Sequence, residues 1–265
     1  MAASTSEELK AYWTNLSDWY LQTAVKVTTN VFHSYAHMLK LDEAERVLEA
    51  GCGNGNGIPI ILSHASQTTE IFGTDLTPAL LDKAREKNFP RTTLQEANSE
   101  ALPFPENHFD RYIANLSLQI VTDPEQMLRE AYRVTRPGAL CAFSVWGDRE
   151  TCQFMTWSAK AIKEVGIELP EGPRSNFHLN DKEQLRSMIL NAGFSQVLCF
   201  ENAFPLPYMN EDEITRVFEG MPMLAQYKET GQFDSIISTI RGYVRTLLQS
   251  GNLPCFSSLV ALVVK

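Results

Sequence analysis

The chain has 265 residues, of which 44% are hydrophobic and 10% aromatic, enough to bury a sizeable core as one domain or as one domain with a lid. Its formal net charge is −9, from 32 acidic and 23 basic residues, and the sequence contains no block of lysines or arginines. This balance disfavours polyanionic partners such as DNA or tRNA, because they require a basic surface.

The cysteines and the apolar runs narrow the class of protein further. Five scattered cysteines without a C-x-x-C pair predict neither a disulfide framework nor a zinc cage. The longest obvious apolar run, residues 259–264, has the length of a strand and not of a membrane span. Residues 1–10 lack the basic start and apolar stretch of a secretory signal. We therefore expect a cytoplasmic protein in a reducing compartment.

Residues 1–45 have a helical pattern. Four aromatic residues gather near its start: Tyr12, Trp13, Trp19 and Tyr20. A second amphipathic run continues through Val31 and Leu39. We expect this stretch to form a helical lid, with Tyr20 closing over a ligand. The alternative is that the aromatic rings simply pack on the surface of the domain.

Residues 47–55, VLEAGCGNG, carry an apolar strand into Glu49 and then into glycines at alternate positions, Gly51, Gly53 and Gly55. Glycine adopts backbone conformations at a tight strand-to-helix turn that most side chains forbid. Turns of this kind usually cradle a nucleotide-like cofactor at the carboxyl edge of a parallel sheet. The spacing differs from G-x-G-x-x-G, the fingerprint of dinucleotide-binding proteins.

The next apolar run, residues 71–74, ends in Asp75. An acidic side chain at the tip of a second strand can accept hydrogen bonds from both hydroxyls of a ribose. The alternative is that Asp75 caps the following helix, but Thr77 and Pro78 already supply an N-cap and a first helical residue. The sequence therefore predicts that Asp75 binds a ribose.

Strands and helices alternate over residues 46–146, which implies parallel strands joined by right-handed crossovers. Asp123, followed by Pro124 and Gln126, forms a variant of the capping box, so we expect Asp123 to be structural. The remaining chain should hold covering segments and the last strands. In chain order we expect a lid-like helix at 151–165, a Pro/Gly-rich loop at 169–174, a helix opened by Asn180 and closed at Gly193, a strand near Val197, two helices, and a strand at 259–264.

These motifs resemble, in order and spacing, those of class I S-adenosylmethionine-dependent methyltransferases of the small-molecule type, similar to the ubiquinone-menaquinone C-methyltransferases. E-x-G-x-G-x-G resembles motif I of that family. Residues 96–110, EANSEALPFPENHFD, resemble its acid-Ala-Glu-x-LPF stretch. Residues 129–146, REAYRVTRPGALCAFSVW, resemble its R-V-L-K-P-G-G turn and fifth strand, with Ala139 in place of the second glycine. The resemblance covers most of residues 47–146.

The resemblance implies an α/β fold with a doubly wound, seven-stranded, mostly parallel sheet of the Rossmann-like methyltransferase kind and helical lid elements. Its sixth and seventh strands would form an antiparallel hairpin at the edge of the sheet. The implied domains are a lid at 1–45 and a methyltransferase domain at 46–265, with substrate-covering insertions at about 147–195 and 207–252. The implied cofactor is S-adenosyl-L-methionine, which leaves as S-adenosyl-L-homocysteine.

The resemblance also implies the residues that bind the cofactor. They are Tyr20, Glu49, Gly51, Cys52, Gly53, Asp75, Leu76, Asn98, Ser99 and Asn115. The family places an aspartate after its third strand to accept from the adenine amino group, and Asn98 can accept the same bond without the charge. Leu76 would lie beside the adenine, the Ser99 backbone N–H near its ring, and Asn115 at the amino-acid end of the cofactor.

The acceptor is harder to predict, because a sulfonium methyl is already activated and the protein mainly holds an electron-rich atom near it. A general base is needed only when that atom is protonated. Candidate residues for the acceptor pocket are Trp146, Phe154, Trp157 and Phe177, any of which could instead belong to the core. His178, just ahead of a capped helix, and Gln119, in the loop after the fourth strand, are the candidates for a catalytic role.

We therefore predict an enzyme that transfers a methyl group from S-adenosylmethionine to O, N or C of a small-molecule acceptor by in-line displacement. The alternative is a cofactor-binding regulatory or scaffold protein without turnover. An intact set favours the enzyme, and its members are Glu49, Gly51, Gly53 and Asp75. Asn98 and Ala139, which depart from the family, keep the alternative open. A nicotinamide-dependent oxidoreductase is a distant third, because it needs a different glycine spacing. The sequence identifies neither the acceptor nor the oligomeric state.

Overall fold

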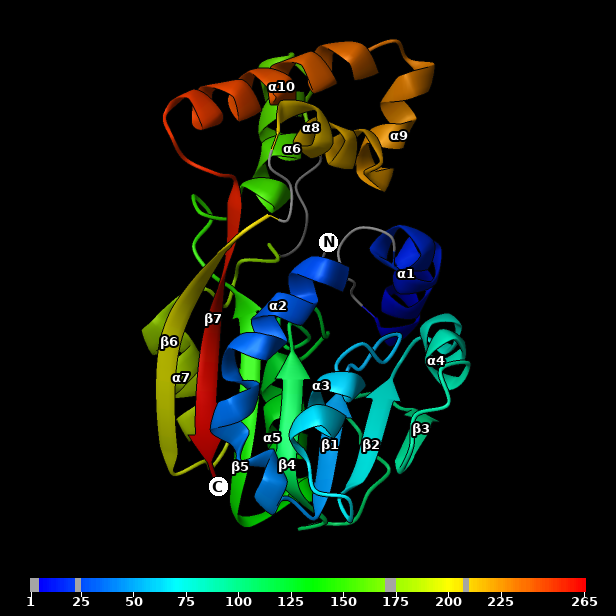
Figure 1. Ribbon diagram of the computed structural model, residues 1–265, viewed down its shortest axis with the longest axis vertical. Helices are drawn as coiled ribbons and strands as arrows, with labels where there is room; N and C mark the ends of the chain where they lie inside the picture. Colours follow the sequence, from blue (N-terminus) through cyan, green and yellow to red (C-terminus); the bar gives the residue numbers. More distant parts are fainter. Residues whose placement is uncertain (1–4, 22–24, 170–174, 207–209) are drawn as a thin grey trace.

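The computed structural model describes residues 5–21, 25–169, 175–206 and 210–265. They form one seven-stranded sheet in the order β3-β2-β1-β4-β5-β7-β6, with helices on both faces (Figure 1). The strands are β1 (Arg46–Ala50), β2 (Glu70–Asp75), β3 (Thr92–Glu96), β4 (Phe109–Asn115), β5 (Thr135–Trp146), β6 (Gln196–Pro205) and β7 (Cys255–Val264). The first five strands are parallel, and β7 is antiparallel to both β5 and β6. The predicted doubly wound sheet with its edge hairpin is confirmed.

Successive residues of the central strands alternate between two buried clusters, as the pleat requires. Val47 and Ile113 pack on one face with α2 (Val25–Ala36) and α3 (Ile58–His64). Leu48 and Tyr112 pack on the other face with α5 (Pro124–Val134) and α7 (Lys182–Asn191). Both faces of the parallel strands are therefore covered, and this explains why the strands read as continuous apolar runs.

Two more helices and two short 3-10 helices complete the sheet domain. Helix α1 (Ser6–Trp19) lies near α4 (Pro78–Arg85), whereas η2 (His37–Leu39) and η3 (Leu41–Glu43) connect α2 to β1. Within the stretch 1–45, α2 is thus part of the core, and only α1 crosses an edge of the sheet (Figure 1). No helix in the described ranges combines the length and apolarity that crossing a bilayer requires.

A helical layer, here called the cap, lies beyond the carboxyl ends of the strands (Figure 1). It consists of α6 (Gln153–Glu164), α8 (Glu211–Glu219), α9 (Pro222–Glu229) and α10 (Phe233–Gln249). Trp157 of α6 stacks on Phe218 of α8, with ring centroids 6.0 Å apart, and packs against Tyr243 of α10. We predicted two helices after the sixth strand, and the described residues form three. Pro222 begins a separate helix because proline lacks the N–H that a continuing helix needs.

The helix caps hold one confirmed prediction and one error. Asp123 caps α5, because its Oδ1 accepts from a backbone N–H at 2.9 Å. Asp181, and not Asn180, is the N-cap of α7. The Asn180 Nδ2 instead donates to the carbonyl of Gly147 at 3.3 Å, so tertiary contact decided between two adjacent capping residues. The predicted loop at 169–174 falls outside the described residues, apart from its first residue.

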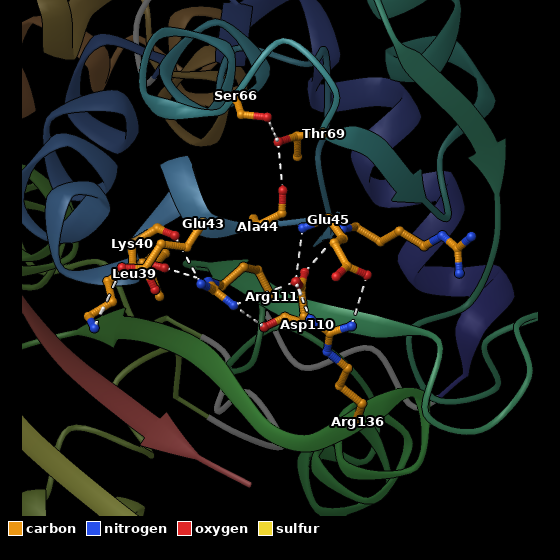
Figure 2. Close-up of polar contacts among 11 residues, drawn as sticks. Leu39, Lys40, Glu43, Ala44, Glu45, Ser66, Thr69, Asp110, Arg111 and Arg136 are labelled. Atoms are coloured by element: carbon orange, nitrogen blue, oxygen red, sulfur yellow. Dashed lines mark hydrogen bonds and ion pairs between the residues drawn. The ribbon is translucent and has the colours of Figure 1, made fainter.

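At the amino ends of the strands, Asp110 and Arg111 fasten the connection between α2 and β1 (Figure 2). Asp110 is buried and accepts from the backbone N–H groups of residues 45 and 46, at 2.9 and 3.0 Å. Its carboxylate also pairs with the Arg136 guanidinium at 2.9 Å. Arg111 donates to the carbonyls of residues 39 and 40. Each buried charge is satisfied here, so this cluster is structural and lies far from the carboxyl edge.

Candidate active site

The turn after β1 contains three glycines in the left-handed backbone region. The φ angles of Gly51, Gly53 and Gly55 are +76°, +55° and +75°. A Cβ added at Gly51 would lie 2.7 Å from the Cβ of Ser117, and one added at Gly55 would lie 2.8 Å from the ring of Phe89. At Gly53, an added Cβ would meet no described atom within 4 Å. All three positions therefore need glycine for conformation, but only Gly53 leaves room for a ligand to approach.

Asp75 lies at the end of β2, directly against this turn. Its Oδ2 accepts from the Gly53 N–H at 2.8 Å, and its Oδ1 accepts from the Thr77 N–H at 2.9 Å. Burial raises the pKa of the Asp75 carboxyl, while these backbone bonds oppose the shift. A carboxylate has about four acceptor positions, so Asp75 keeps capacity for hydroxyls of a ligand. Thr77 occupies the N-cap of α4 and Pro78 begins the helix, as predicted, although the Thr77 side chain forms no capping bond.

Glu49 lies near the end of β1 and is only 4% exposed. Its Oε2 is buried and has no hydrogen-bond partner among the described residues. Burial raises the pKa of Glu49 to about 8, the negative charge of Asp75 adds to the shift, and Lys87 opposes it. An unpartnered buried carboxyl is costly until a donor reaches it. A cationic ligand with an ammonium group would supply both the donor and the charge.

The segment after α4 contacts the glycine turn and supports it. Lys87 Nζ donates to the carbonyl of Asn54 at 2.8 Å and also to the side-chain oxygen of Asn56. The ring of Phe89 covers Gly55. Helix α4 thus joins the turn at both of its ends, through Asp75 before it and Lys87 after it. Sequence reasoning missed Lys87, because no spacing signal marks a residue that contacts a turn 33 positions away.

Helix α1 crosses the carboxyl edge beside β3 (Figure 1). Lys10 forms an ion pair with Glu96 at the end of β3. Asn98 donates from Nδ2 to the Ser6 hydroxyl at 3.2 Å, and its Oδ1 accepts from the Glu100 N–H at 2.9 Å. The amide that stands in place of the family's aspartate therefore also holds α1. A second lone pair on its oxygen remains for an adenine amino group.

Tyr20 follows α1 and lies close to the acidic groups. Its ring meets Trp13 edge-on at 5.7 Å, and its hydroxyl forms a hydrogen bond with the Thr28 hydroxyl at 3.1 Å. Burial raises the pKa of Tyr20 to about 12, and the charges of Asp75 and Glu49 contribute to this shift. The structure thus brings Tyr20 to the predicted site, and its contact with a cofactor stays a prediction.

Asn115, at the end of β4, uses most of its hydrogen-bonding capacity on other residues of the chain. Its Oδ1 accepts from the hydroxyls of Tyr35 and Ser144, at 3.1 and 2.9 Å. Its Nδ2 donates to the carbonyl of Thr28 at 3.0 Å. Asn115 therefore fixes α2 against β4 and β5, and one N–H remains for a ligand. The other predicted cofactor residues, Cys52, Leu76 and Ser99, follow β1, β2 and β3 along the same edge.

The loop after β4 packs on the glycine turn through Ser117. Leu116 has a φ of +52°, a strained conformation for a residue with a branched side chain. Gln119 is buried, and its Nε2 donates to the Leu116 carbonyl at 2.9 Å. The Gln119 Oε1 is buried without a hydrogen bond to any described residue. The loop that packs on the turn thus contains a buried acceptor oxygen that is unpartnered among the described residues, and a catalytic role for Gln119 stays a prediction.

Three of the four residues predicted to line the acceptor pocket lie on β5 and in the cap. Trp146 ends β5 and meets Phe256 of β7 edge-on at 6.2 Å. Trp157 is buried inside the cap, as the alternative core interpretation expects. Phe154 belongs to α6, but its side chain lies outside the described structure. Of these aromatic residues, Trp146 therefore stands at the carboxyl edge itself.

Phe177 and His178 lie in the turn before α7. The Arg149 guanidinium lies over the ring of Phe177 at 5.0 Å. His178 Nδ1 lies 2.8 Å from the Ser175 carbonyl. A carbonyl can only accept, so Nδ1 carries the proton and Nε2 is the basic nitrogen. The turn thus sets the tautomer that a general base would need, and that role stays a prediction.

The comparisons with known proteins agree with this geometry. Residues 48–143 match the family model for the methyltransferase domain. The malonyl-[acyl-carrier protein] O-methyltransferase of Halorhodospira halophila is 30% identical over 177 residues, which cover 64% of this chain and 55% of that protein. The ubiquinone/menaquinone biosynthesis C-methyltransferase UbiE of Yersinia enterocolitica is 27% identical over 169 residues, covering 58% and 67%. The chain thus spans about half to two thirds of the length of these relatives.

Among solved structures, the [4+2]-cyclase SpnF is similar over 100% of this chain and 97% of its own, with a TM-score of 0.63. At 16% sequence identity this likeness shows the fold alone. The sheet, the glycine turn with its acidic partners and the family match define a Rossmann-like methyltransferase. Residues 48–143 are thus a methyltransferase domain, and the chain is similar to the class I S-adenosylmethionine-dependent methyltransferases of the small-molecule type, the family that its motifs resemble. S-adenosylmethionine is the cofactor of that class, and the residues on this edge fit it.

Proposed function

We propose that the protein transfers the methyl group of S-adenosylmethionine to O, N or C of a small-molecule acceptor and releases S-adenosylhomocysteine. One arrangement carries this proposal: the open face of Gly53, the Asp75 carboxylate bound to its N–H, and the unpartnered Oε2 of Glu49 beside them. A ligand that fits this arrangement needs a segment that approaches a bare backbone, hydroxyls for Asp75 and a cation for Glu49. S-adenosylmethionine has all three.

The residues of the chain would bind the cofactor, orient the acceptor and shield both from water. They need do no more to activate the methyl group, because the sulfonium of the bound cofactor already does so. Asp75 would hold the ribose, and ionised Glu49 would accept from the ammonium group. The Gln119 Oε1 would accept a hydrogen bond from a protonated nucleophile, and His178 Nε2 would take its proton where one must leave. In-line transfer then needs the acceptor atom at about 3 to 3.5 Å from the methyl carbon.

We also propose that α1 acts as a lid over the cofactor. The support is its position on the edge, its two contacts beside the adenine loop, and Tyr20 near the carboxyls. Deleting residues 1–22 should weaken the binding of S-adenosylhomocysteine, and the cofactor should protect this segment from protease. A truncated protein with full affinity and an intact sheet by circular dichroism would remove Tyr20 from the site.

Turnover is favoured over a silent cofactor-binding protein. Both relatives named above are methyltransferases. The Asn98 departure, which seemed to weaken the enzyme hypothesis, has a structural use in the bond to Ser6. We further propose a reducing, cytoplasmic setting, because all five cysteines are free thiols and four of them are buried. The net charge of −9 argues against a nucleic-acid acceptor.

A labelled methyl donor tests the proposal. The protein is incubated with S-[methyl-³H]adenosylmethionine and with small-metabolite, protein and nucleic acid fractions of the source cell. We expect label in the small-metabolite fraction only, and its loss with Asp75→Ala. Tight binding of S-adenosylhomocysteine without transfer to any fraction would instead establish the silent binding protein.

A further inference from the structure

Ser258 is a buried polar residue that the cofactor site does not use. It lies in β7, is 0% exposed, and its Oγ makes no hydrogen bond within the described part of the chain. Its cross-strand partners are Trp146 of β5 and Asn202 of β6. Paired residues of adjacent strands point to the same face of a sheet. The three side chains therefore form one row across β5, β7 and β6.

This row faces α2 and the cap, not α5 and α7. Asn202 donates from Nδ2 to the Ser34 hydroxyl of α2 at 3.0 Å, and Phe256, two residues before Ser258, packs on Trp146. The rows of this face continue toward the cofactor. Ser144, two residues before Trp146, bonds to Asn115 at the end of β4. Since β4, β5 and β7 are neighbours in the sheet, Ser258 lies on the side of the edge where an acceptor would extend away from the cofactor.

The other unpartnered oxygens at this edge have a nearer explanation. Glu49 lies near the end of β1, just before the glycine turn, and Gln119 lies in the loop that packs on this turn through Ser117. The hydroxyl of Thr74 is also unpartnered among the described residues, and the carbonyl of the same residue accepts from the Gly51 N–H of the turn at 2.8 Å. Ser258 has no such neighbour. A serine hydroxyl that is buried without a partner destabilises the free protein, so a residue of this kind calls for a partner that arrives with a ligand.

The surroundings of Ser258 define the chemistry of that partner. The residues that share its face on β5, β6 and β7 are uncharged: Ser144, Trp146, Phe200, Asn202, Phe204, Phe256 and Val260. Glu201 lies between two residues of this face, so its side chain points to the opposite side. A charged group would be desolvated here without a counterion. A neutral hydroxyl or carbonyl needs only the hydrogen bond that Ser258 offers.

We propose that Ser258 is a specificity-determining residue, which binds a neutral hydroxyl or carbonyl group of a largely apolar acceptor lying against Trp146. The proposal rests on the function proposed above. It separates neutral acceptors from carboxylates, phosphates and amines, which this row of the sheet cannot pair.

A thermal measurement tests whether the hydroxyl is unpartnered in the free protein. Ser258→Ala should raise the Tm, because it removes a buried group that bonds to nothing. Ser144→Ala is the matched contrast on the same face and should lower the Tm, because that hydroxyl bonds to Asn115 and to the Leu116 N–H. A loss of Tm in Ser258→Ala equal to that in Ser144→Ala would overturn the proposal.

Methyl transfer tests the specificity. The probe is tritiated S-adenosylmethionine with a chloroform-phase and an aqueous-phase extract of the source cell. The wild type should label neutral compounds of the chloroform phase, and Ser258→Ala should lower that rate about tenfold or more, since a site left with an unpaired acceptor group discriminates strongly. The Kd for S-adenosylhomocysteine should stay within about twofold. Ser195→Ala should behave as the wild type, because Ser195 is an exposed serine just before β6 that bonds to the carbonyl of Val264 at the opposite end of β7.

The outcomes separate the two proposals. Label confined to ionic compounds of the aqueous phase, or an unchanged rate in Ser258→Ala, would refute the role of Ser258 and leave methyl transfer established. A wild-type protein that binds S-adenosylhomocysteine but labels neither phase would refute the proposed function, and the Ser258 proposal would fall with it.

Discussion

The two halves of the carboxyl edge of the sheet differ in the chemical groups that they present. Over β1 and β2, backbone N–H groups and carboxylates converge, with Gly53 bound to Asp75 and Glu49 beside them. Over β5 and β7, uncharged side chains share one face, and Trp146 is the cross-strand partner of Ser258, whose hydroxyl is unpartnered among the described residues. In the proposed function, the first half binds the charged and ribose groups of the cofactor through a backbone turn. The second half would contact the acceptor through side chains, so it could change with the acceptor while the first half stays constant.

The largest effects should come from the glycine turn, where two glycines differ in kind. Gly51→Val places a branched side chain against Ser117 at a left-handed φ, so the free energy of unfolding should fall by about 3 kcal/mol or more in a urea titration. Gly53→Val should cost only the backbone strain, about 1 to 2 kcal/mol, yet abolish binding of S-adenosylhomocysteine.

Equal losses of stability in the two variants would mean that the difference between a packed and an open glycine does not exist. Normal binding by Gly53→Val would show that no ligand approaches this backbone.

The next largest effect should come from the loss of Asp75, the proposed acceptor for the ribose hydroxyls. Asp75→Ala removes a charged partner, and such hydrogen bonds contribute about 1.5–3 kcal/mol. Calorimetry should show affinity for S-adenosylhomocysteine falling roughly tenfold or more. Asp82→Ala is the control, because Asp82 is exposed on α4 and pairs only with Arg85 among the contacts described. If the Asp75 variant binds as tightly as this control, Asp75 only stabilises the glycine turn and does not bind the ribose.

The pH dependence should report Glu49. Its pKa in the folded protein is about 8 against an ordinary value of 4.5, so between these values the folded protein holds a proton that the unfolded chain has lost. The free energy of unfolding should therefore fall as the pH rises through this window. A ligand with an ammonium group binds the ionised form, so its affinity should rise with pH, by at most about tenfold per unit.

Titrations with S-adenosylhomocysteine from pH 5.5 to 7.5 check this. Glu49→Gln should flatten the affinity profile, because the amide does not titrate. A profile that keeps its slope in that variant would assign the pH dependence to another group.

The smallest effect on cofactor affinity should come from Lys87, which supports the glycine turn. Lys87→Met removes two hydrogen bonds that support the glycine turn, each of which contributes roughly 0.5–1.5 kcal/mol to the folded state. Only part of this loss should reach the ligand, because Lys87 supports the turn and is not a proposed cofactor contact, so we expect affinity to fall about three- to tenfold. Lys83→Met, at an exposed lysine on α4 four residues earlier, should have no effect. Because Lys87 also lowers the pKa of Glu49, its loss should move the affinity profile toward higher pH. A weaker affinity with an unmoved profile would leave Lys87 a purely mechanical support.

The sequence by itself determined the sheet, the glycine turn and Asp75. These signals are local: an apolar run, a turn that needs left-handed φ angles and an acid at the next strand end act within a few residues of each other. The order of such signals also implied the parallel topology, since short crossovers leave few alternatives. The same locality explains the errors, because Asn180 and Asp181 are equally good caps until a distant carbonyl, that of Gly147, engages one of them.

Only the tertiary structure decided which groups surround the turn and which remain unpartnered. Ser117 against Gly51, Lys87 against the turn, and Ser6 against Asn98, 92 residues apart, are contacts between segments whose sequences carry no mutual signal. Ser258 is polar in a strand that reads as apolar, and only the register of β5, β7 and β6 shows that it is buried beside Trp146. Whether a buried polar atom is satisfied depends on everything packed around it, and that is a property of the folded chain.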